Sequence, residues 1–360
     1  MPRIVQILPT VVYGDAVSNH ALALADILKQ MNLETEIYAQ NIGRGAQGKV
    51  KHMDRYRNSG KDILIYHMST GTSLSQDVMK MPSFRKVMIY HNITPPEFMR
   101  DYSWRDYRIL REGRRQLAMM KDTFDWAFGD SEYNCRELSQ YGYRNVHLLP
   151  ILISYPDYGK VPSRRILTKY QDGRTNILFL GRIAPNKRQE DIIKTFFYYR
   201  NYMDPTSRLF LVGSYTGMER YYGALQLLTE KLELADVFFT GKVPFEEILA
   251  YYRISDVFLC MSEHEGFCVP LIESMLFQVP ILAYSSTAIP DTLGNAGVLL
   301  KEKDYGIAAE LLNRIVHDQV LRDKLIANEA KRLEHFSYER VAGCVREYIK
   351  EILGEENEQK

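Results

Sequence analysis

The chain has 360 residues, of which 46% are hydrophobic and 25% are charged, and its formal net charge is +1. This length exceeds one average domain and suits two of ordinary size. Because the net charge is close to zero, the composition makes no general case for a nucleic-acid partner.

The cysteines and the lengths of the apolar runs indicate the cellular compartment. Cys135, Cys260, Cys268 and Cys344 occur without Cys-x-x-Cys pairs, so reduced, mostly buried thiols are predicted rather than a zinc site or a disulfide framework. No run approaches the ~20 apolar residues that cross a bilayer. The apolar run at 4–8 is strand-like and too short for a signal peptide. A cytoplasmic location is therefore predicted.

Residues 1–155 alternate between strand-like and helix-like segments. Short apolar runs of buried-strand type occur at 4–8, 36–39, 63–66, 87–90, 126–128 and 146–149. Residues 16–31 have helical spacing, and the other gaps are long enough for helices. This alternation predicts an α/β domain with a parallel sheet. The stretch 41–60, rich in glycine and basic residues, is predicted to be a loop with little structure of its own.

A polar segment at 156–175, punctuated by proline and glycine, is predicted to link this domain to a second one. The alternation resumes over 176–336, with strand-like runs at 177–180, 209–212, 237–239, 257–261, 280–283 and 298–300. Two consecutive doubly wound domains predict a cleft between two sets of strand ends. Residues 337–360 contain an amphipathic helix that must dock on another surface.

The stretch 262–273 carries the clearest chemistry. It follows an apolar strand, and Pro270 suits the start of a helix, so the segment reads as strand, turn and helix. Glu265 and Glu273 stand eight positions apart, and each carboxylate is able to accept hydrogen bonds from paired sugar hydroxyls. Gly266 between them allows close approach of the backbone to a ligand. The alternative is that these acids only complement a helix dipole, which is the preferred interpretation for Glu273 taken alone.

The turn after the first strand of the second domain is basic. Gly181 suits a tight turn, Arg182 offers a planar fork of donors, and Lys187 offers an ammonium group near the next helix start. Together they are able to neutralise a pyrophosphate through charge-assisted hydrogen bonds. A basic pair alone is weak evidence, because most such residues face water.

The first domain has a similar turn at Gly14, where a glycine before a helix leaves backbone N–H groups for a phosphate. A plain turn glycine is an equally good interpretation, since neither a G-x-G-x-x-G nor a G-x-x-x-x-G-K-[ST] motif is present. His91 follows another strand and is a candidate to contact a sugar hydroxyl or the acceptor. A capping or core histidine is nearly as good an interpretation, and His67 competes for the same role.

The segment 100–121 interleaves arginines with aromatic and aliphatic residues. Arg105, Arg108, Arg111, Arg114 and Arg115 alternate with Tyr102, Trp104, Tyr107, Leu110 and Leu117. Such a helix is able to lie on an anionic membrane surface. An ordinary solvated surface helix is slightly preferred.

Taken together, these motifs resemble the large retaining glycosyltransferase family with the GT-B fold, often called group 1 or family 4. The resemblance rests on Glu265-x7-Glu273, the Gly181-Arg182-x4-Lys187 turn and the strand 279–282. It is strong over 176–300 and weaker at Gly14-Asp15, at 90–92 and at 130–132. Many family members carry two glycines where this chain has Gly14-Asp15.

The resemblance implies a fold and a set of roles. The fold would be α/β, with two doubly wound, Rossmann-like domains facing a cleft and a C-terminal helix crossing back to the first domain. Residues 1–155 would bind the acceptor and 176–336 the nucleotide sugar. Arg182 and Lys187 would hold the donor diphosphate, Glu273 the ribose, and Glu265 with the backbone of Gly266 and Phe267 the sugar. Gly14 would meet a phosphate, His91 would lie near the primary hydroxyl of the sugar, and Val243 would meet the base through its backbone.

The resemblance therefore implies a metal-independent, retaining hexosyltransferase without a cofactor. Its donor would be a nucleoside diphosphate sugar of UDP or GDP type, and its acceptor would be a hydroxyl group of a glycan or a lipid-linked sugar. The protein would act at the inner face of a membrane if the segment 100–121 binds there. No nucleic-acid partner is expected. The alternatives are an epimerase or phosphorylase on the same fold, since fold does not fix reaction, and a non-catalytic partner subunit.

Overall fold

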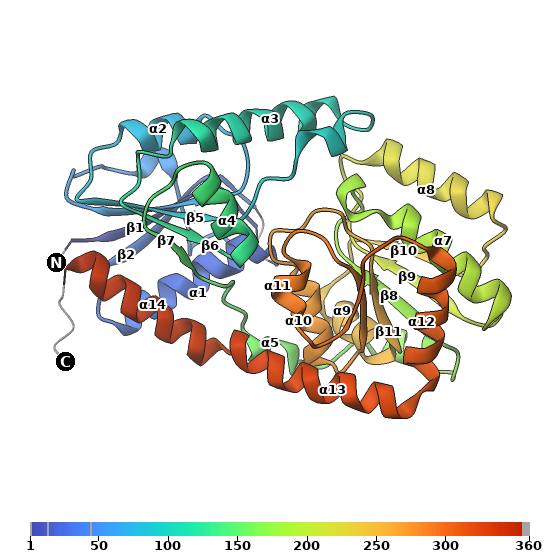
Figure 1. Cartoon of the computed structure of the whole chain (residues 1–360). Helices are drawn as coiled ribbons and strands as arrows, with labels where there is room; N and C mark the ends of the chain where they lie inside the picture. The colour runs from blue at the N-terminus through green and yellow to red at the C-terminus, as the bar shows by residue number, and fades with distance from the viewer. Residues whose placement is uncertain (1, 13, 44, 355–360) are drawn as a thin grey trace. The chain divides into compact units, whose positions relative to one another are not determined.

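The computed structural model describes residues 2–12, 14–43 and 45–354. The chain divides into two compact α/β units (Figure 1). Unit 1 comprises Met1–Pro96, Arg105–Ser154 and His335–Lys360, and unit 2 comprises Glu97–Trp104 and Tyr155–Glu334. Within the described ranges, no helix combines the length and the apolar character needed to cross a membrane.

Unit 1 is built on a seven-stranded parallel sheet in the order β3-β2-β1-β4-β5-β6-β7. The strands are β1 (Ile4–Val11), β2 (Thr35–Ile42), β3 (Lys51–His52), β4 (Ile63–Met68), β5 (Arg85–Tyr90), β6 (Trp126–Gly129) and β7 (Val146–Leu148). Each strand-like run predicted in this half of the sequence corresponds to one of them, and only the run at 146–149 extends one residue past its strand. The central strands are buried on both faces, as expected of a parallel sheet covered by helices.

Helices cover both faces of this sheet (Figure 1). They are α1 (Ala16–Gln30), α2 (Leu74–Lys80), α3 (Trp104–Met119), α4 (Glu132–Gln140) and α14 (Tyr338–Leu353), with a 3-10 turn at Met53–Arg55. A further 3-10 turn at Pro96–Met99 lies where the chain passes from unit 1 to the segment 97–104 of unit 2. Side chains from α2, α3 and α4 pack on one face, and side chains from α1 and α14 pack on the other. The final helix therefore docks on the first domain, as predicted.

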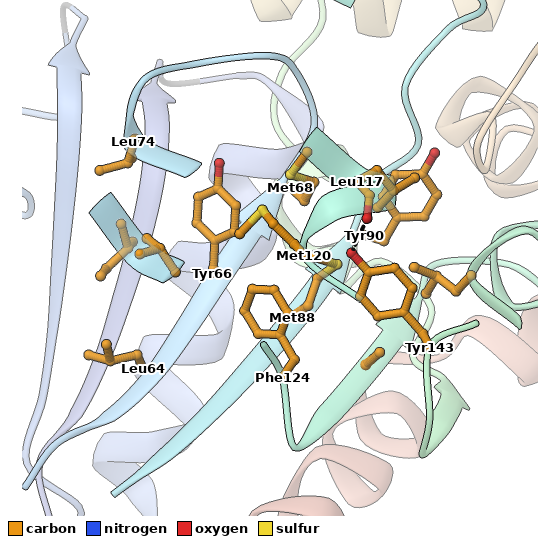
Figure 2. Packing of buried hydrophobic residues seen from close by; sticks show 14 of the residues in the cluster. Leu64, Tyr66, Met68, Leu74, Met88, Tyr90, Leu117, Met120, Phe124 and Tyr143 are labelled. Carbon is orange, nitrogen blue, oxygen red and sulfur yellow. Dashed lines mark hydrogen bonds between the residues drawn. The ribbon is translucent and has the colours of Figure 1, made fainter. Parts of the chain in front are cut away.

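Alternate residues of each strand supply the two cores, because successive side chains point to opposite faces of a sheet. Tyr66 and Met88 lie in the cluster with α2 and α3, whereas Ile65 and Ile89 lie in the cluster with α1 and α14. Figure 2 shows the first cluster, in which Tyr66 and Met88 pack beside Met120.

The prediction of a loop with little structure over 41–60 is wrong. Strand β2 continues to Ile42, β3 pairs with β2 in parallel, and a 3-10 turn follows. Ala46, Val50 and Tyr56 are buried. The segment is thus an edge of the sheet, with too few apolar residues in a row to produce a periodic signal.

Unit 2 is built on a six-stranded parallel sheet in the order β10-β9-β8-β11-β12-β13. The strands are β8 (Asn176–Leu180), β9 (Arg208–Val212), β10 (Val237–Gly241), β11 (Val257–Cys260), β12 (Ile281–Tyr284) and β13 (Val298–Leu300). All six coincide with strand-like runs of the sequence.

The helices of unit 2 are α5 (Tyr155–Tyr158), α6 (Arg164–Tyr170), α7 (Gln189–Tyr202), α8 (Glu219–Lys231), α9 (Phe245–Ile254), α10 (Val269–Leu276), α11 (Ile289–Leu293), α12 (Tyr305–His317) and α13 (Gln319–Leu333). Single 3-10 turns lie at Pro185–Lys187 and Glu334–Phe336. Residues 156–175, predicted to be a linker, include most of α5 and all of α6. Helix α6 packs against α9, which buries Ile166 and Tyr170.

Candidate functional site

Strand order places the candidate loops of unit 2 at one position. Strand β8 lies between β9 on one side and β11 on the other, so the chain reverses its direction of winding between β8 and β11. In such sheets, ligands bind outside the carboxyl ends of the strands at this reversal point. The turn after β8 (181–188) and the loop after β11 (261–268) both start there.

Lys187 and Glu265 meet across this position. The Lys187 ammonium lies 2.5 Å from Glu265 Oε2, and the Glu265 side chain is only 7% exposed. Burial alone lowers the pKa of Lys187, but the Glu265 carboxylate outweighs that effect and holds the pKa above its usual range. The sequence motifs therefore form a charged pair at the end of the sheet, in which Glu265 is buried and Lys187 is partly exposed.

Hydrogen bonds to backbone groups hold the two loops together. The side-chain amide of Asn186 donates to the carbonyl oxygen of His264 at 3.0 Å, and the backbone N–H of Glu263 donates to the backbone carbonyl of Asn186 at 2.9 Å. The N–H of Glu265 donates to the Thr287 hydroxyl at 2.8 Å. Because each loop is anchored by the other, the Lys187–Glu265 pair is set by the fold rather than by two mobile side chains.

Arg182 is exposed beside the end of β9. Its Nη2 donates to the carbonyl oxygen of Thr216 at 3.2 Å. At the same edge, Gly213 allows the ends of β8 and β9 to approach, since a Cβ there would lie 1.9 Å from the Gly181 oxygen. Gly213 was not singled out from the sequence, and only its position directly after a strand hinted at this role.

Glu273 is held by two tyrosines. Its Oε1 accepts a hydrogen bond from the Tyr158 hydroxyl and its Oε2 one from the Tyr252 hydroxyl, both at 2.7 Å. Burial raises the pKa of the Glu273 carboxyl, and the two hydrogen bonds oppose that rise only in part. Sequence reasoning missed both tyrosines, and Tyr158 lies in the segment predicted to be a linker.

The remaining predicted residues of unit 2 lie along the same strand ends. Gly266 and Phe267 follow Glu265 in the loop, and the carbonyl oxygen of Phe267 accepts from the Thr292 hydroxyl at 2.6 Å. Val243 lies in the turn between β10 and α9 and is partly exposed. These positions are consistent with a ligand that extends along several strand ends.

A charged network that sequence reasoning missed borders the basic turn. Asp191 is fully buried, and Lys303 Nζ lies 2.7 Å from its Oδ2 and 2.8 Å from Glu263 Oε1. Arg188 pairs with the same two acids and adopts a left-handed backbone conformation with φ of 54°. Lys303 is far from these acids in sequence, so no motif signals this network.

In unit 1, Gly14 and Asp15 form the turn between β1 and α1. Gly14 has φ of 88°, which favours glycine, and its N–H donates to Asn19 Oδ1 at 3.3 Å. Asp15 is the N-cap of α1, because its carboxylate accepts from the Ser18 N–H at 3.1 Å and the Ser18 hydroxyl at 3.0 Å. The residue that departs from the family pattern thus has a local structural role.

His91 belongs to a buried chain of polar side chains. Its Nδ1 lies 2.8 Å from Asp130 Oδ2, and its Nε2 lies 2.9 Å from His67 Nδ1. His67 Nε2 lies 2.9 Å from Gln6 Oε1, and the Gln6 amide is oriented by donation to the Ala21 carbonyl. Burial holds the pKa of His67 far below its usual range, so that ring is neutral.

These contacts fix the direction of the hydrogen bonds. His67 must donate through Nε2 to Gln6 Oε1, and its Nδ1 must therefore accept from the Nε2–H of His91. Both ring nitrogens of His91 consequently have protein partners. The sequence located His91 at a strand end, but it did not reveal that neighbouring strands enclose the ring.

The loop after β11 also brings together two cysteines that are separate in the sequence. The Sγ atoms of Cys260 and Cys268 and a carboxylate oxygen of Glu265 all lie within 4.8 Å of one another, and all three residues are buried. Cys268 adopts a left-handed conformation with φ of 70° at the start of α10. No motif in the sequence indicates this cluster.

Residues 164–332 match the family model described as glycosyl transferases group 1. Part of the chain is 26% identical over 176 residues to the O-antigen chain mannosyltransferase B of Escherichia coli, covering 48% of this chain and 45% of that protein. Another part is 23% identical over 190 residues to the capsular polysaccharide biosynthesis glycosyltransferase CapM of Staphylococcus aureus, covering 49% and 47%. The matched regions thus span about half the length of these curated relatives.

The likeness in structure extends over nearly the whole chain. HepE of Anabaena, solved in complex with UDP-glucose, superimposes with a TM-score of 0.75 over 97% of this chain and 99% of that one, at 16% identity. This likeness establishes a shared fold. The chain accordingly has the GT-B fold, with two Rossmann-like domains, and its residues 164–332 match the group 1 glycosyl transferases.

Proposed function

We propose that this protein transfers a hexosyl unit from a nucleoside diphosphate sugar, of UDP or GDP type, to a hydroxyl acceptor with retention at the anomeric carbon. The observation that carries the proposal is the pairing of the partly exposed Lys187 with the buried Glu265 at the reversal point between β8 and β11. It lies within the residues that match glycosyl transferases group 1. The mannosyltransferase relative and the UDP-glucose complex of HepE support the same reading.

The cations of the basic turn would stabilise the leaving group. Arg182 and Lys187 are proposed to donate charge-assisted hydrogen bonds to the diphosphate, where negative charge develops as the glycosidic bond breaks. We propose that no metal ion is required, because these two side chains bring positive charge to that position. The donor phosphate would help to deprotonate the acceptor, so no enzyme nucleophile is needed.

The acids of the loop would recognise hydroxyl groups. Glu265, with the backbone of Gly266 and Phe267, is proposed to bind the sugar, and Glu273 the ribose. Each carboxylate oxygen of Glu273 already accepts one tyrosine hydrogen bond and has a further lone pair for a hydroxyl. Tyr158 and Tyr252 would then act as positioning residues that hold the carboxylate in place.

The other predicted contacts complete the proposal. Gly14 would meet a donor phosphate, Gly181 would allow the turn to approach it, and Val243 would contact the base through its backbone. His91 would lie near the primary hydroxyl of the sugar.

We further propose an acceptor that is a glycan or a lipid-linked sugar, presented at the inner face of a membrane. The supporting observation is an exposed basic face on α3 formed by Arg105, Arg108 and Arg111, with Trp104 exposed at the first helical residue. Arg114 does not belong to it, because it pairs with Glu137. Sedimentation with vesicles of anionic phospholipid measures this attachment.

Donor binding and transfer test the main proposal. A panel of UDP and GDP sugars is screened for a rise in melting temperature, since a ligand at 100 times its Kd stabilises the native state by about 2.7 kcal/mol. Arg182→Ala is the most direct variant because the side chain is exposed. With the donor found, its kcat for transfer should fall by about 100- to 1,000-fold.

Lys231→Ala provides the matched control, because this cation is also exposed in unit 2 but lies at the end of α8. It should retain wild-type transfer. Wild-type activity in Arg182→Ala, or an isomerised nucleotide sugar as the product, would refute the proposal. A sugar phosphate formed with inorganic phosphate would instead indicate a phosphorylase.

A further inference from the structure

The cluster of Cys260, Glu265 and Cys268 has the ligand set of a soft cation. Cys260 ends β11, Glu265 lies in the following loop and Cys268 directly precedes α10. Their ligand atoms lie within 4.8 Å of one another and the side chains are buried. Two thiolates and a carboxylate suit Zn²⁺ or Cd²⁺, whereas Mg²⁺ and Ca²⁺ prefer oxygen ligands.

The surrounding charges permit such a site despite the nearby ammonium of Lys187. Each thiol loses its proton when its sulfur binds the metal. The reaction M²⁺ + 2 RSH → M(SR)₂ + 2 H⁺ exchanges two protons for one divalent cation, so the total charge of the cluster is unchanged. The Lys187–Glu265 pair therefore meets no added positive charge, and a carboxylate oxygen of Glu265 lies within 4.8 Å of both sulfurs.

The contacts between the two sulfurs support a paired role. The Cys260 thiol donates to the Ser262 hydroxyl oxygen at 3.4 Å, and the sulfur atoms of Cys260 and Cys268 lie within 4.8 Å of each other. The backbone at Cys268 is in a region that residues with a Cβ rarely adopt. The Cys268 side chain is nevertheless aimed at Cys260.

We propose that Cys260, Cys268 and Glu265 form a binding site for one thiophilic divalent cation, such as Zn²⁺ or Cd²⁺, with water as the remaining ligand. The site is separate in chemistry from the proposed transfer, which needs no metal. If Glu265 also binds the donor sugar, the cation and the donor compete. This last consequence rests on the proposed function.

Cadmium titration of the reduced full-length protein tests the site. Cd²⁺ bound to thiolates produces a charge-transfer absorption in the ultraviolet, which should saturate at one cation per chain with release of two protons. Cys260→Ser and Cys268→Ser should each lose most of this absorption. Glu265→Gln should keep the absorption but weaken the affinity at least as much as loss of an outer-shell partner does, that is by about 10-fold or more.

Cys135→Ser and Cys344→Ser are the matched controls, because these cysteines are partly exposed and lie outside the cluster. Both should titrate like the wild type, and circular dichroism confirms that every variant is folded. Absorption of wild-type strength in Cys260→Ser, or no saturating absorption in the folded wild type, would overturn the proposal. If the cation binds as expected but leaves the Kd of the donor unchanged, the role of Glu265 in sugar binding fails and the cation site stands.

Discussion

Glu329 is a buried acid without a partner among the described residues. It lies on α13, is 0% exposed, and neither carboxyl oxygen has a hydrogen bond. Burial raises its pKa from 4.5 to about 8, with a small opposing effect of Arg322. Because a buried polar group without a hydrogen bond costs free energy, Glu329 destabilises the folded state around α13.

The sign of the pH dependence follows from that shift. Because the pKa of Glu329 is higher in the folded state than in the unfolded state, its stabilising contribution is fully present below pH 4.5. That contribution is lost as the pH rises to about 8. Between about pH 5 and about pH 8, the free energy of unfolding should fall by about 3 kcal/mol from this group alone. Glu329→Gln should remove that loss, measured by urea denaturation at both pH values.

Glu310→Gln is the control for Glu329, because Glu310 is an exposed acid on the neighbouring helix α12. It should leave the pH dependence unchanged. The same slope in Glu329→Gln as in the wild type would contradict the prediction.

Single residues differ in how well the sequence predicts their surroundings. Lys187 and Glu265 each follow a strand, and adjacent parallel strands end at one edge, so their meeting was predictable. Glu273 was predicted to be a site residue, but its tyrosine partners depend on where α5 and α9 pack. His91 is enclosed by His67 and Asp130 from two neighbouring strands, which no local motif reveals.

At the scale of elements, the turn before α1 offers a test that separates structure from function. Asp15→Ala removes the N-cap of α1 and should lower the free energy of unfolding by about 1 kcal/mol. Asp15→Asn preserves a capping oxygen and should cost less. Urea denaturation measures both variants.

Asp304→Ala is the comparison for Asp15, since Asp304 caps α12 in unit 2 through the Ile307 N–H at 2.9 Å. It should lower stability by a similar amount. If Asp15→Asn keeps its stability but loses sugar transfer, Asp15 acts on a substrate. Unchanged stability in Asp15→Ala would show that the cap contributes little.

The elements themselves were largely predictable because most strands are continuous apolar runs. Buried parallel strands need apolar residues on both faces, which produces runs such as 177–180 and 209–212. Strand β3 has only two residues, both exposed, and therefore has no such signal. Helices α5 and α6 are too short for the periodic pattern that identified α1 and α14.

At the scale of the whole molecule, positive and negative charges nearly cancel, but positive charge is concentrated on one face of α3. The formal net charge of +1 gives no general attraction to anionic surfaces. Residues three apart share one face of a helix, so Arg105, Arg108 and Arg111 concentrate positive charge on α3. Arg115 contributes less, because Glu112 pairs with it at 2.6 Å.

This local charge predicts salt-sensitive binding to membranes. Each arginine near an anionic surface contributes about 1 kcal/mol, so replacing Arg105, Arg108 and Arg111 together by glutamine should weaken vesicle binding by up to about 100-fold. Co-sedimentation with vesicles that contain anionic phospholipid measures the change. Replacing Lys231, Lys324 and Lys331 by glutamine removes the same charge from exposed positions of unit 2 and should have little effect. Equal losses in both triple variants, or equal binding to neutral vesicles, would show that α3 is an ordinary solvated helix.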